Sequence, residues 1–295
     1  MTPILHTPDF INQWRKMLVA LYGYKHDGDA LMVPEVTGTS TSVYLPLLSY
    51  SDLSAADAQE KIATLSRKKY QIRSIDASCQ SFLPNDTVTM RLALRGKSAE
   101  ELFKKTIHPK CRNHIRKSEK TGLSLGDGVD EKTIKNFYEI FSTTMHRHGT
   151  PVFSRKLFEF LPHFVNSQYL VAYHEGRAVA ALCLVFDGKL AWVPWAGSLF
   201  EHRDLRPNHF LYWVAIQRSL AAGMEVFDFG RSGYLAPTYD FKSDWGAMPV
   251  KLVTLTSDKT DVYQKYTFAA AVWKKLPKRV SDSIGPILCK YLPDL

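Results

Sequence analysis

The chain has 295 residues, of which 45% are hydrophobic and 23% are charged. This composition is typical of a globular protein with a sizeable core and excludes a disordered chain, and the length favours two domains. The formal net charge of +9 indicates an anionic partner, which could be a tRNA, coenzyme A, a nucleotide-linked or phospholipid-linked substrate, or a membrane surface.

Several classes of protein are disfavoured by simple patterns. No run of about 18 apolar residues is present, so we expect no transmembrane helix. The first residues lack the basic and apolar regions of a secretory signal, and we therefore expect a cytoplasmic protein. The cysteines are widely spaced and form no CxxC pair, so no metal site is predicted; they are Cys79, Cys111, Cys183 and Cys289.

The first half mixes helical and strand-like segments. Helical spacing occurs at 8–21 and 55–69, and strand patterns occur at 30–36, 42–48, 71–75 and 87–94. Ser98 and Glu101 then form a capping-box pattern that begins a helix. It leads into the most basic stretch, 104–120, which fits either contact with a phosphate backbone or a solvated helix face.

A second unit begins near Asp127 and has a clearer order of elements. Helices are predicted at 130–147 and 154–164, followed by strands at 169–173, 178–186 and 190–195 that are joined by tight turns. A loop at 197–207, a helix at 208–222 and a short strand at 226–229 complete the unit. This is the order of a GNAT acyltransferase domain, although other α+β domains share it.

Four blocks of the second half form a specific combination. They are VPWAGS at 193–198, PNHFLYW at 207–213, GMEVFDFGRS at 223–232 and YDFKSDWGA at 239–247. Together with RNHIRK at 112–117 and MHRHGTPV at 145–152, this combination resembles the FemAB family of peptidoglycan-bridge aminoacyltransferases. The tail segments 273–277 and 284–286 are similar to those of FemAB-related proteins from PEP-CTERM/exosortase exopolysaccharide systems.

The resemblance covers residues 90–295 and implies an α/β (α+β) fold of two tandem GNAT-like domains. Each would hold a mixed, mostly antiparallel sheet flanked by helices. The expected domains are 1–126, completed by the C-terminal segment 262–295, and 127–261. Residues 1–89 match weakly and are shorter than is usual in the family, which leaves open whether this half binds an acceptor. The oligomeric state also stays open.

The implied activity is that of an acyltransferase or aminoacyltransferase. An acyl or aminoacyl group would pass from an activated donor, either aminoacyl-tRNA or acyl-CoA, to an amine of a cell-envelope or exopolysaccharide precursor. No tightly bound cofactor is expected. Such a reaction needs orientation and stabilisation of the developing oxyanion, and it needs no covalent enzyme intermediate.

Three residues are the candidates for catalysis. The resemblance implies that Lys242 stabilises the reacting carbonyl or the donor phosphate, and a lysine suits either role as a movable point charge. Phe241 precedes it and would shape the same pocket. Asp228 could pair with Arg231 or Lys242 and fix its position. Ordinary packing for Phe241 and a structural ion pair for Asp228 are equally good interpretations.

A second set of residues is assigned to substrate binding: Arg231, Tyr239, Trp195, Arg203, Arg206 and Asn208. Arg231 follows a strand end, which is where α/β folds place ligands. The helix that begins at Asn208 offers free N–H groups and a dipole to a phosphate. The glycines of the usual coenzyme A signature are missing from 203–208, and this absence weakens the acetyl-CoA interpretation.

Two other functions stay open. One is a GNAT-type, acyl-CoA-dependent N-acyltransferase that acts on a small molecule, and the other is a non-catalytic FemAB-fold binding protein. His146 and His148 could serve as a base or as a helix cap. The tail 262–295 interleaves aromatic residues with lysines, which suits peripheral contact with a membrane or packing against the first domain.

Overall fold

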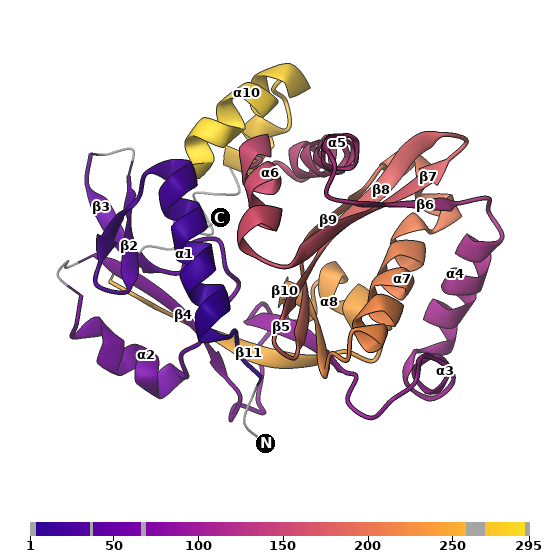
Figure 1. Cartoon of the computed structure of the whole chain (residues 1–295), viewed down its shortest axis with the longest axis horizontal. Helices are drawn as coiled ribbons and strands as arrows, with labels where there is room; N and C mark the ends of the chain where they lie inside the picture. The colour runs from indigo at the N-terminus through magenta and orange to yellow at the C-terminus, as the bar shows by residue number, and fades with distance from the viewer. Residues whose placement is uncertain (1–3, 36–37, 66–68, 258–268, 293–295) are drawn as a thin grey trace.

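The computed structural model describes residues 4–35, 38–65, 69–257 and 269–292. Within these residues eleven strands form one open sheet (Figure 1). Their order across the sheet is β1 (Lys25–Asp27), β2 (Ala30–Pro34), β3 (Ser40–Tyr44), β4 (Tyr70–Asp76), β11 (Met248–Thr256), β5 (Thr87–Ala93), β10 (Val226–Gly233), β9 (Leu190–Ser198), β8 (Arg177–Asp187), β7 (Ser167–His174) and β6 (Ser124–Gly128).

The sheet is mostly antiparallel, with parallel pairing between β3 and β4 and between β9 and β10. The helices that flank it are α1 (Pro8–Tyr22), α2 (Ala55–Ile62), α3 (Ala99–Glu101), α4 (Pro109–Glu119), α5 (Glu131–His148), α6 (Arg155–Phe164), α7 (Pro207–Ala221), α8 (Pro237–Ser243) and α10 (Lys278–Cys289). The predicted α/β (α+β) class, a mostly antiparallel sheet flanked by helices, is confirmed. None of the helices in the described residues has the length and apolar character needed to span a bilayer.

The side chains of β8 point alternately to the two faces of the sheet and contribute to a hydrophobic core on each face. Ala181 and Cys183 pack with Phe137 of α5 in one buried cluster. Ala180, Leu182 and Leu184 pack with Leu211 and Ile216 of α7 in another. Because successive strand side chains point to opposite faces, α5 and α7 cover opposite sides of the same strands. Packing against the two faces of the sheet fixes the positions of α5 and α7, and the candidate site lies between these two helices.

The pairing of β9 and β10 is short. Residues 226–228 pair with 190–192, and beyond this point the two strands are no longer paired with each other. The separation coincides with Gly230, whose φ is +76° and whose Cβ, if present, would lie 3.1 Å from the carbonyl oxygen of Val193. A glycine is therefore required both by the left-handed backbone and by the close strand. The cavities described below lie beyond the paired residues, toward the carboxyl ends of β9 and β10.

Several elements differ from the sequence expectations. Strands β1, β6 and β11 and helices α8 and α10 were not predicted, and α2 ends at Ile62. The basic stretch is interrupted by a π-helical turn, Leu102–Thr106, before Pro109 begins α4. β11 lies between β4 and β5, a long-range pairing that local patterns do not reveal.

The two halves share the sheet. β5 pairs with β10, and β11 lies between two strands of the first half. Residue 126 lies within β6, which pairs with β7. At the other end α10 packs against α5, while the Tyr24 hydroxyl donates a hydrogen bond to the Lys290 carbonyl. The predicted boundary near 126 and the completion of the first domain by 262–295 stay predictions, and 258–268 and 293–295 lie outside the described residues.

Gly246 sets how closely the loop after α8 packs against the π-helical turn. Its φ is +80°, and an added Cβ would lie 2.5 Å from Thr106 Cγ2 and 2.9 Å from the Thr106 carbonyl oxygen. We expect Gly246→Ala to lower the free energy of unfolding by about 1–2 kcal/mol from backbone strain, plus about 1–3 kcal/mol from overpacking. Urea denaturation measures the loss.

The matched control is Gly176→Ala in the turn between β7 and β8. There φ is +77° but nothing lies within 4 Å of the added Cβ, so only the strain contribution is expected. Equal losses for the two variants would show that the contact with Thr106 does not limit this packing.

Candidate functional site

Two cavities meet where β9 and β10 separate. The larger has a volume of about 470 Å³ and the smaller about 290 Å³. Both are lined by Ala196, Tyr212, Thr238 and Lys242. Lys242 therefore lies at the junction of the two cavities, on helix α8.

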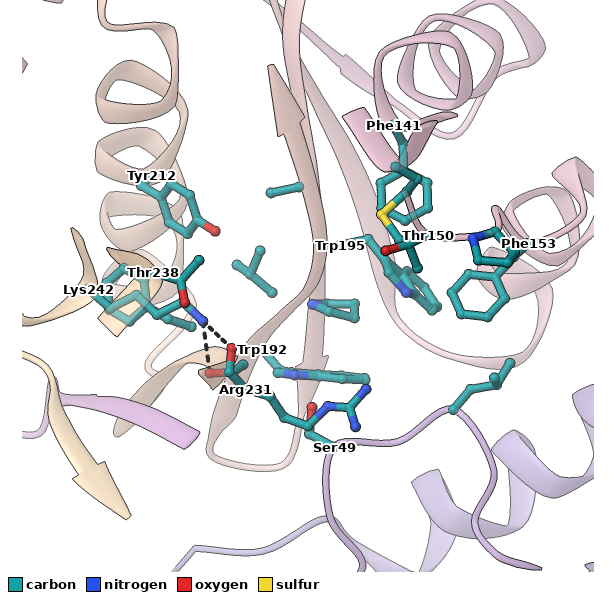
Figure 2. Close-up of a pocket in the computed structure, with 18 residues that line it drawn as sticks. Ser49, Phe141, Thr150, Phe153, Trp192, Trp195, Tyr212, Arg231, Thr238 and Lys242 are labelled. Atoms are coloured by element: carbon teal, nitrogen blue, oxygen red, sulfur yellow. Dashed lines mark hydrogen bonds between the residues drawn. The ribbon is translucent and has the colours of Figure 1, made fainter. Parts of the chain in front are cut away.

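The wall of the larger cavity is mainly apolar and aromatic. Figure 2 shows its rings and the few polar groups among them. The rings come from α5, from the segment that follows it and from β9, β10 and α7: Phe141, Phe153, Trp192, Trp195, Tyr212 and Phe229. The polar side chains are Ser49, Thr150, Arg231, Thr238 and Lys242. The cavity can hold an apolar group with a few oriented hydrogen bonds.

Polar side chains make up a larger share of the residues that line the smaller cavity. Arg147 and His148 reach it from the C-terminal end of α5, and Asn208 reaches it from the first turn of α7. The Asn208 side-chain amide donates to Ser198 Oγ at 3.1 Å, which ties the start of α7 to the end of β9. Partial desolvation and the neighbouring Arg147 charge lower the pKa of His148. A guanidinium beside a helix N-terminus favours an anionic ligand.

Lys242 is a buried amine with fixed orientation. Its side-chain Nζ donates to the carbonyl oxygens of Gly230, at 3.0 Å, and Arg231, at 2.7 Å (Figure 2). These two bonds use two of the three N–H donors of an ammonium group. Burial, reinforced by the positive charge of Arg231, lowers the pKa of Lys242 to about 8. The side chain is therefore mostly protonated at neutral pH.

Asp228 holds the turn that orients Lys242. The carboxylate is fully buried. One oxygen accepts from Thr89 Oγ1 at 2.6 Å and from the Gly230 N–H at 2.7 Å. The other accepts from the Tyr50 hydroxyl at 2.8 Å and from Arg91 Nε at 3.0 Å. Asp228 does not line either cavity, and its contacts are those of an anchor beneath the site.

The other predicted residues divide into two groups. Phe241 and Asn208 line the smaller cavity, and Arg231 and Trp195 line the larger. The remaining three lie outside both linings: Tyr239, Arg203 and Arg206.

Each residue outside the linings has its own local contacts. The Tyr239 ring packs edge-on against Tyr234. The Arg203 guanidinium lies over the Phe200 ring at 4.1 Å. Arg206 occupies the N-cap of α7 with a left-handed φ of 59°. The structure therefore brings together Lys242, Phe241, Asn208, Arg231 and Trp195 but not these three.

Sequence reasoning missed several lining residues. Tyr212 lies inside the 207–213 block and could have been selected by its motif. Trp192 lies directly before the 193–198 block, and its Nε1 has no hydrogen-bond partner in the described part of the chain. Ser49 reaches the cavity through a loop in which Leu45 and Leu47 have positive φ values of 60° and 68°. Non-glycine residues in this conformation give no sequence signal.

Comparison with known proteins identifies the type of domain. Residues 109–243, less than half of the chain, match the family model described as an acetyltransferase (GNAT) domain. No curated protein matches the chain. The domain match, which spans α4 to α8, confirms that the enzyme class is acyltransferase.

Solved structures of similar fold cover nearly the whole chain. FemX has a TM-score of 0.59 at 13% identity, over 89% of this chain and 94% of that chain. L-PGS from Bacillus licheniformis has a TM-score of 0.51 at 9% identity, over 94% of this chain and 100% of that chain. A C-terminal DUF2156 domain from Agrobacterium fabrum that carries the name lysylphosphatidylglycerol synthetase has a TM-score of 0.53 at 11% identity, over 94% and 96%.

At these identities the structural likeness shows the fold alone. Together with the domain match, this likeness confirms the predicted GNAT-type fold. None of these findings bears on the predicted link to exopolysaccharide systems, which stays a prediction, and the roles of the individual site residues are proposals.

Removing the charge of Asp228 should destabilise the protein strongly. Asp228→Asn leaves the Arg91 guanidinium, whose side chain is 9% exposed, without its carboxylate. Breaking one partner of a buried ion pair typically costs about 3–5 kcal/mol. Guanidinium denaturation of the variant should show a loss of this size in the free energy of unfolding.

The control is Asp86→Asn, which breaks an ion pair with Lys251. The Asp86 side chain is 21% exposed and the Lys251 side chain is 26% exposed. A loss of about 1 kcal/mol or less is expected there. If both variants lost the same small amount, the Asp228 carboxylate would not be the anchor described above.

The lowered pKa of Lys242 predicts a pH-dependent difference in stability. The unfolded lysine keeps its proton up to about the ordinary pKa of 10.5, whereas the folded one loses it at about 8. Between these values the unfolded state binds more protons, so stability rises with pH. Relative to Lys242→Met, the wild-type free energy of unfolding should rise by up to about 3 kcal/mol across this window.

The measurement is chemical denaturation of both proteins at a series of pH values. Their difference removes the contributions of groups that both share. A difference that stays constant, or that falls with rising pH, would contradict the assigned direction of the shift.

Proposed function

We propose that this chain transfers an acyl or aminoacyl group from an activated ester or thioester to an amine, with the reacting carbonyl held beside Lys242. The observation that carries the proposal is the position of that amine. It is buried, it lies at the junction of two cavities, and two backbone carbonyls fix its direction.

The proposed chemistry uses Lys242 as an electrostatic group. The nitrogen of the acceptor forms a bond to the carbonyl carbon, and the carbonyl oxygen becomes negatively charged. The third N–H of the Lys242 ammonium stabilises this oxyanion, and such a charge acts strongly in a site with little water. The intermediate then collapses with cleavage of the C–S or C–O bond. The acceptor nitrogen loses a proton, which the departing sulfur or oxygen takes up directly or through water.

The smaller cavity is assigned to the donor. Arg147 and the first turn of α7 are suited to the phosphate groups that acyl-CoA and aminoacyl-tRNA both carry. The GNAT domain match favours acyl-CoA. Aminoacyl-tRNA is the second donor to be tested, because 203–208 lacks the glycines of the usual coenzyme A signature. Both donors are cytoplasmic, so we propose that the reaction takes place there.

The larger cavity is assigned to the acceptor. Its aromatic wall suits an apolar body, while Arg231 and Ser49 suit an anionic or hydroxyl-bearing part. The FemAB-like motifs support an amine of a cell-envelope or exopolysaccharide precursor as the acceptor. An acyl-CoA-dependent acyltransferase acting on a small apolar amine would use the same arrangement of cavities.

Replacing Lys242 tests the proposal. Lys242→Met removes the charge but keeps the length of the side chain, and removal of one oxyanion donor typically lowers kcat about 100-fold to 1,000-fold. The assay incubates the full chain with acyl-CoA donors or charged tRNA and with a panel of amines, and mass spectrometry detects the product. The wild-type kcat should also fall as the pH rises through about 8, since the ammonium group is then lost.

The matched control is Lys132→Met, which removes an exposed lysine of α5 away from both cavities. Its kcat should equal that of the wild type. Undiminished transfer by Lys242→Met would reject the assigned role. If wild-type protein bound a donor but formed no product with any amine, the non-catalytic alternative would be favoured.

A further inference from the structure

Helix α10 turns three of its four large apolar side chains outward, and the fourth, Leu288, is half-buried. Val280, Ile284 and Ile287 are 39%, 39% and 62% exposed. They follow an i, i+4, i+7 spacing, which places them on one face of the helix. The buried positions of the helix are instead held by small side chains, which are Ser281, Gly285 and Cys289. An ordinary surface helix has the opposite distribution, with its large apolar residues toward the core.

The contacts of the inner face fix this orientation. A Cβ added at Gly285 would lie 2.9 Å from the Val152 backbone nitrogen, so the helix lies close against the segment after α5. Lys278 Nζ donates to Ser142 Oγ of α5 at 2.9 Å. Figure 1 shows α10 at the upper edge of the molecule, above α5 and α6. The outward apolar face therefore cannot be buried by rotating the helix.

Positive charges accompany the exposed face. Lys275 and Arg279, which precede the face in the chain, are exposed, and Val272 in the segment before α10 is an apolar side chain that is 47% exposed. The carboxylate of Asp282 is paired with Lys278 on the side of α5. We call the apolar side chains of Val272, Val280, Ile284 and Ile287, together with these two cations, the α10 surface.

We propose that the α10 surface docks the protein on an anionic lipid bilayer. Apolar side chains on a helix enter the boundary between headgroups and acyl chains, and neighbouring lysines and arginines attract anionic lipids. A second copy of the chain fits this surface less well. Symmetric pairing would bring Arg279 and its neighbours toward their own copies, and a stable dimer buries about 800 Å² per partner, more than three or four side chains supply.

Docking would bring the lipid surface near the larger cavity. Gly285 packs against Val152, and the two residues before Val152 are Thr150 and Pro151, which line that cavity. The bilayer would then lie across α10 from this part of the cavity wall, at a distance of about one helix diameter, 10 Å. The docking itself does not rest on the proposed function, because lipid binding can be measured without turnover.

The experiment is co-flotation of the full chain with vesicles. Vesicles of phosphatidylcholine mixed with phosphatidylglycerol should bind the wild-type protein more tightly than vesicles of phosphatidylcholine alone, and added salt should weaken the binding. Ile287→Asp should lower the affinity about ten-fold or more, since an isoleucine no longer enters the apolar layer. The control is Leu83→Asp, because Leu83 is 68% exposed but lies in the loop between β4 and β5.

A second variant tests the charges without altering the apolar face. Lys275→Gln combined with Arg279→Gln should remove most of the preference for phosphatidylglycerol, and it tests the surface even if Ile287→Asp fails to fold. The proposal is overturned if wild-type protein does not float with either vesicle, or if Ile287→Asp binds as well as Leu83→Asp. Sedimentation equilibrium that shows a dimer which Ile287→Asp dissociates would also overturn it, in favour of a self-association surface.

Discussion

The buried carboxylate of Asp228 is the interaction on which the arrangement of the site depends. It accepts four hydrogen bonds, from Tyr50, Thr89, Arg91 and the Gly230 backbone, and so joins β10 to β5 and to the segment after β3. Arg91 also donates to the Tyr50 hydroxyl at 2.7 Å, which closes the network. A buried network is stable only when every member is paired. Because the Gly230 N–H is one of its donors, the same network fixes the direction of the carbonyls that hold the lysine amine.

Burying the Lys242 ammonium group costs desolvation free energy. A residue with a purely structural role at this position would not need a charge. Two backbone carbonyls compensate the ammonium group only in part, since burial still lowers its pKa to about 8. An apolar side chain of similar length would avoid this desolvation cost. A cation kept in such a position is typical of functional sites, where stability is lost in favour of charge at the reacting atoms. The positive charge that Lys242 keeps at neutral pH is what the proposed transfer needs.

Short-range sequence patterns predicted the helices and strands of the second half, where the spacing of apolar residues determines each element. The helical spacing that predicted α5 and the alternation that predicted β7, β8 and β9 reflect burial against one shared sheet. The motif blocks located Lys242, Phe241 and Asn208, which line the cavities. They also selected Asp228, whose partners at Tyr50 and Arg91 come from distant segments that no spacing connects. Ser49 was missed because a loop with positive φ values at leucines positions it, and α10 was missed because small residues face inward there and reverse the usual pattern.

The polar groups of the larger cavity limit what it can hold. The Trp192 ring is 1% exposed, and its N–H has no partner in the described residues. An unpaired buried donor costs about 1–3 kcal/mol, and the protein covers this nitrogen almost completely. The third N–H of Lys242 and the side chain of Arg231 belong to the same wall. Lys242 and Arg231 lie where β9 and β10 separate, and aromatic rings form most of the rest of the wall, with Ser49, Thr150 and Thr238 as the other polar side chains. A ligand with oxygen atoms at one end and an apolar body at the other satisfies both parts, whereas a wholly polar acceptor would leave the aromatic wall without contacts.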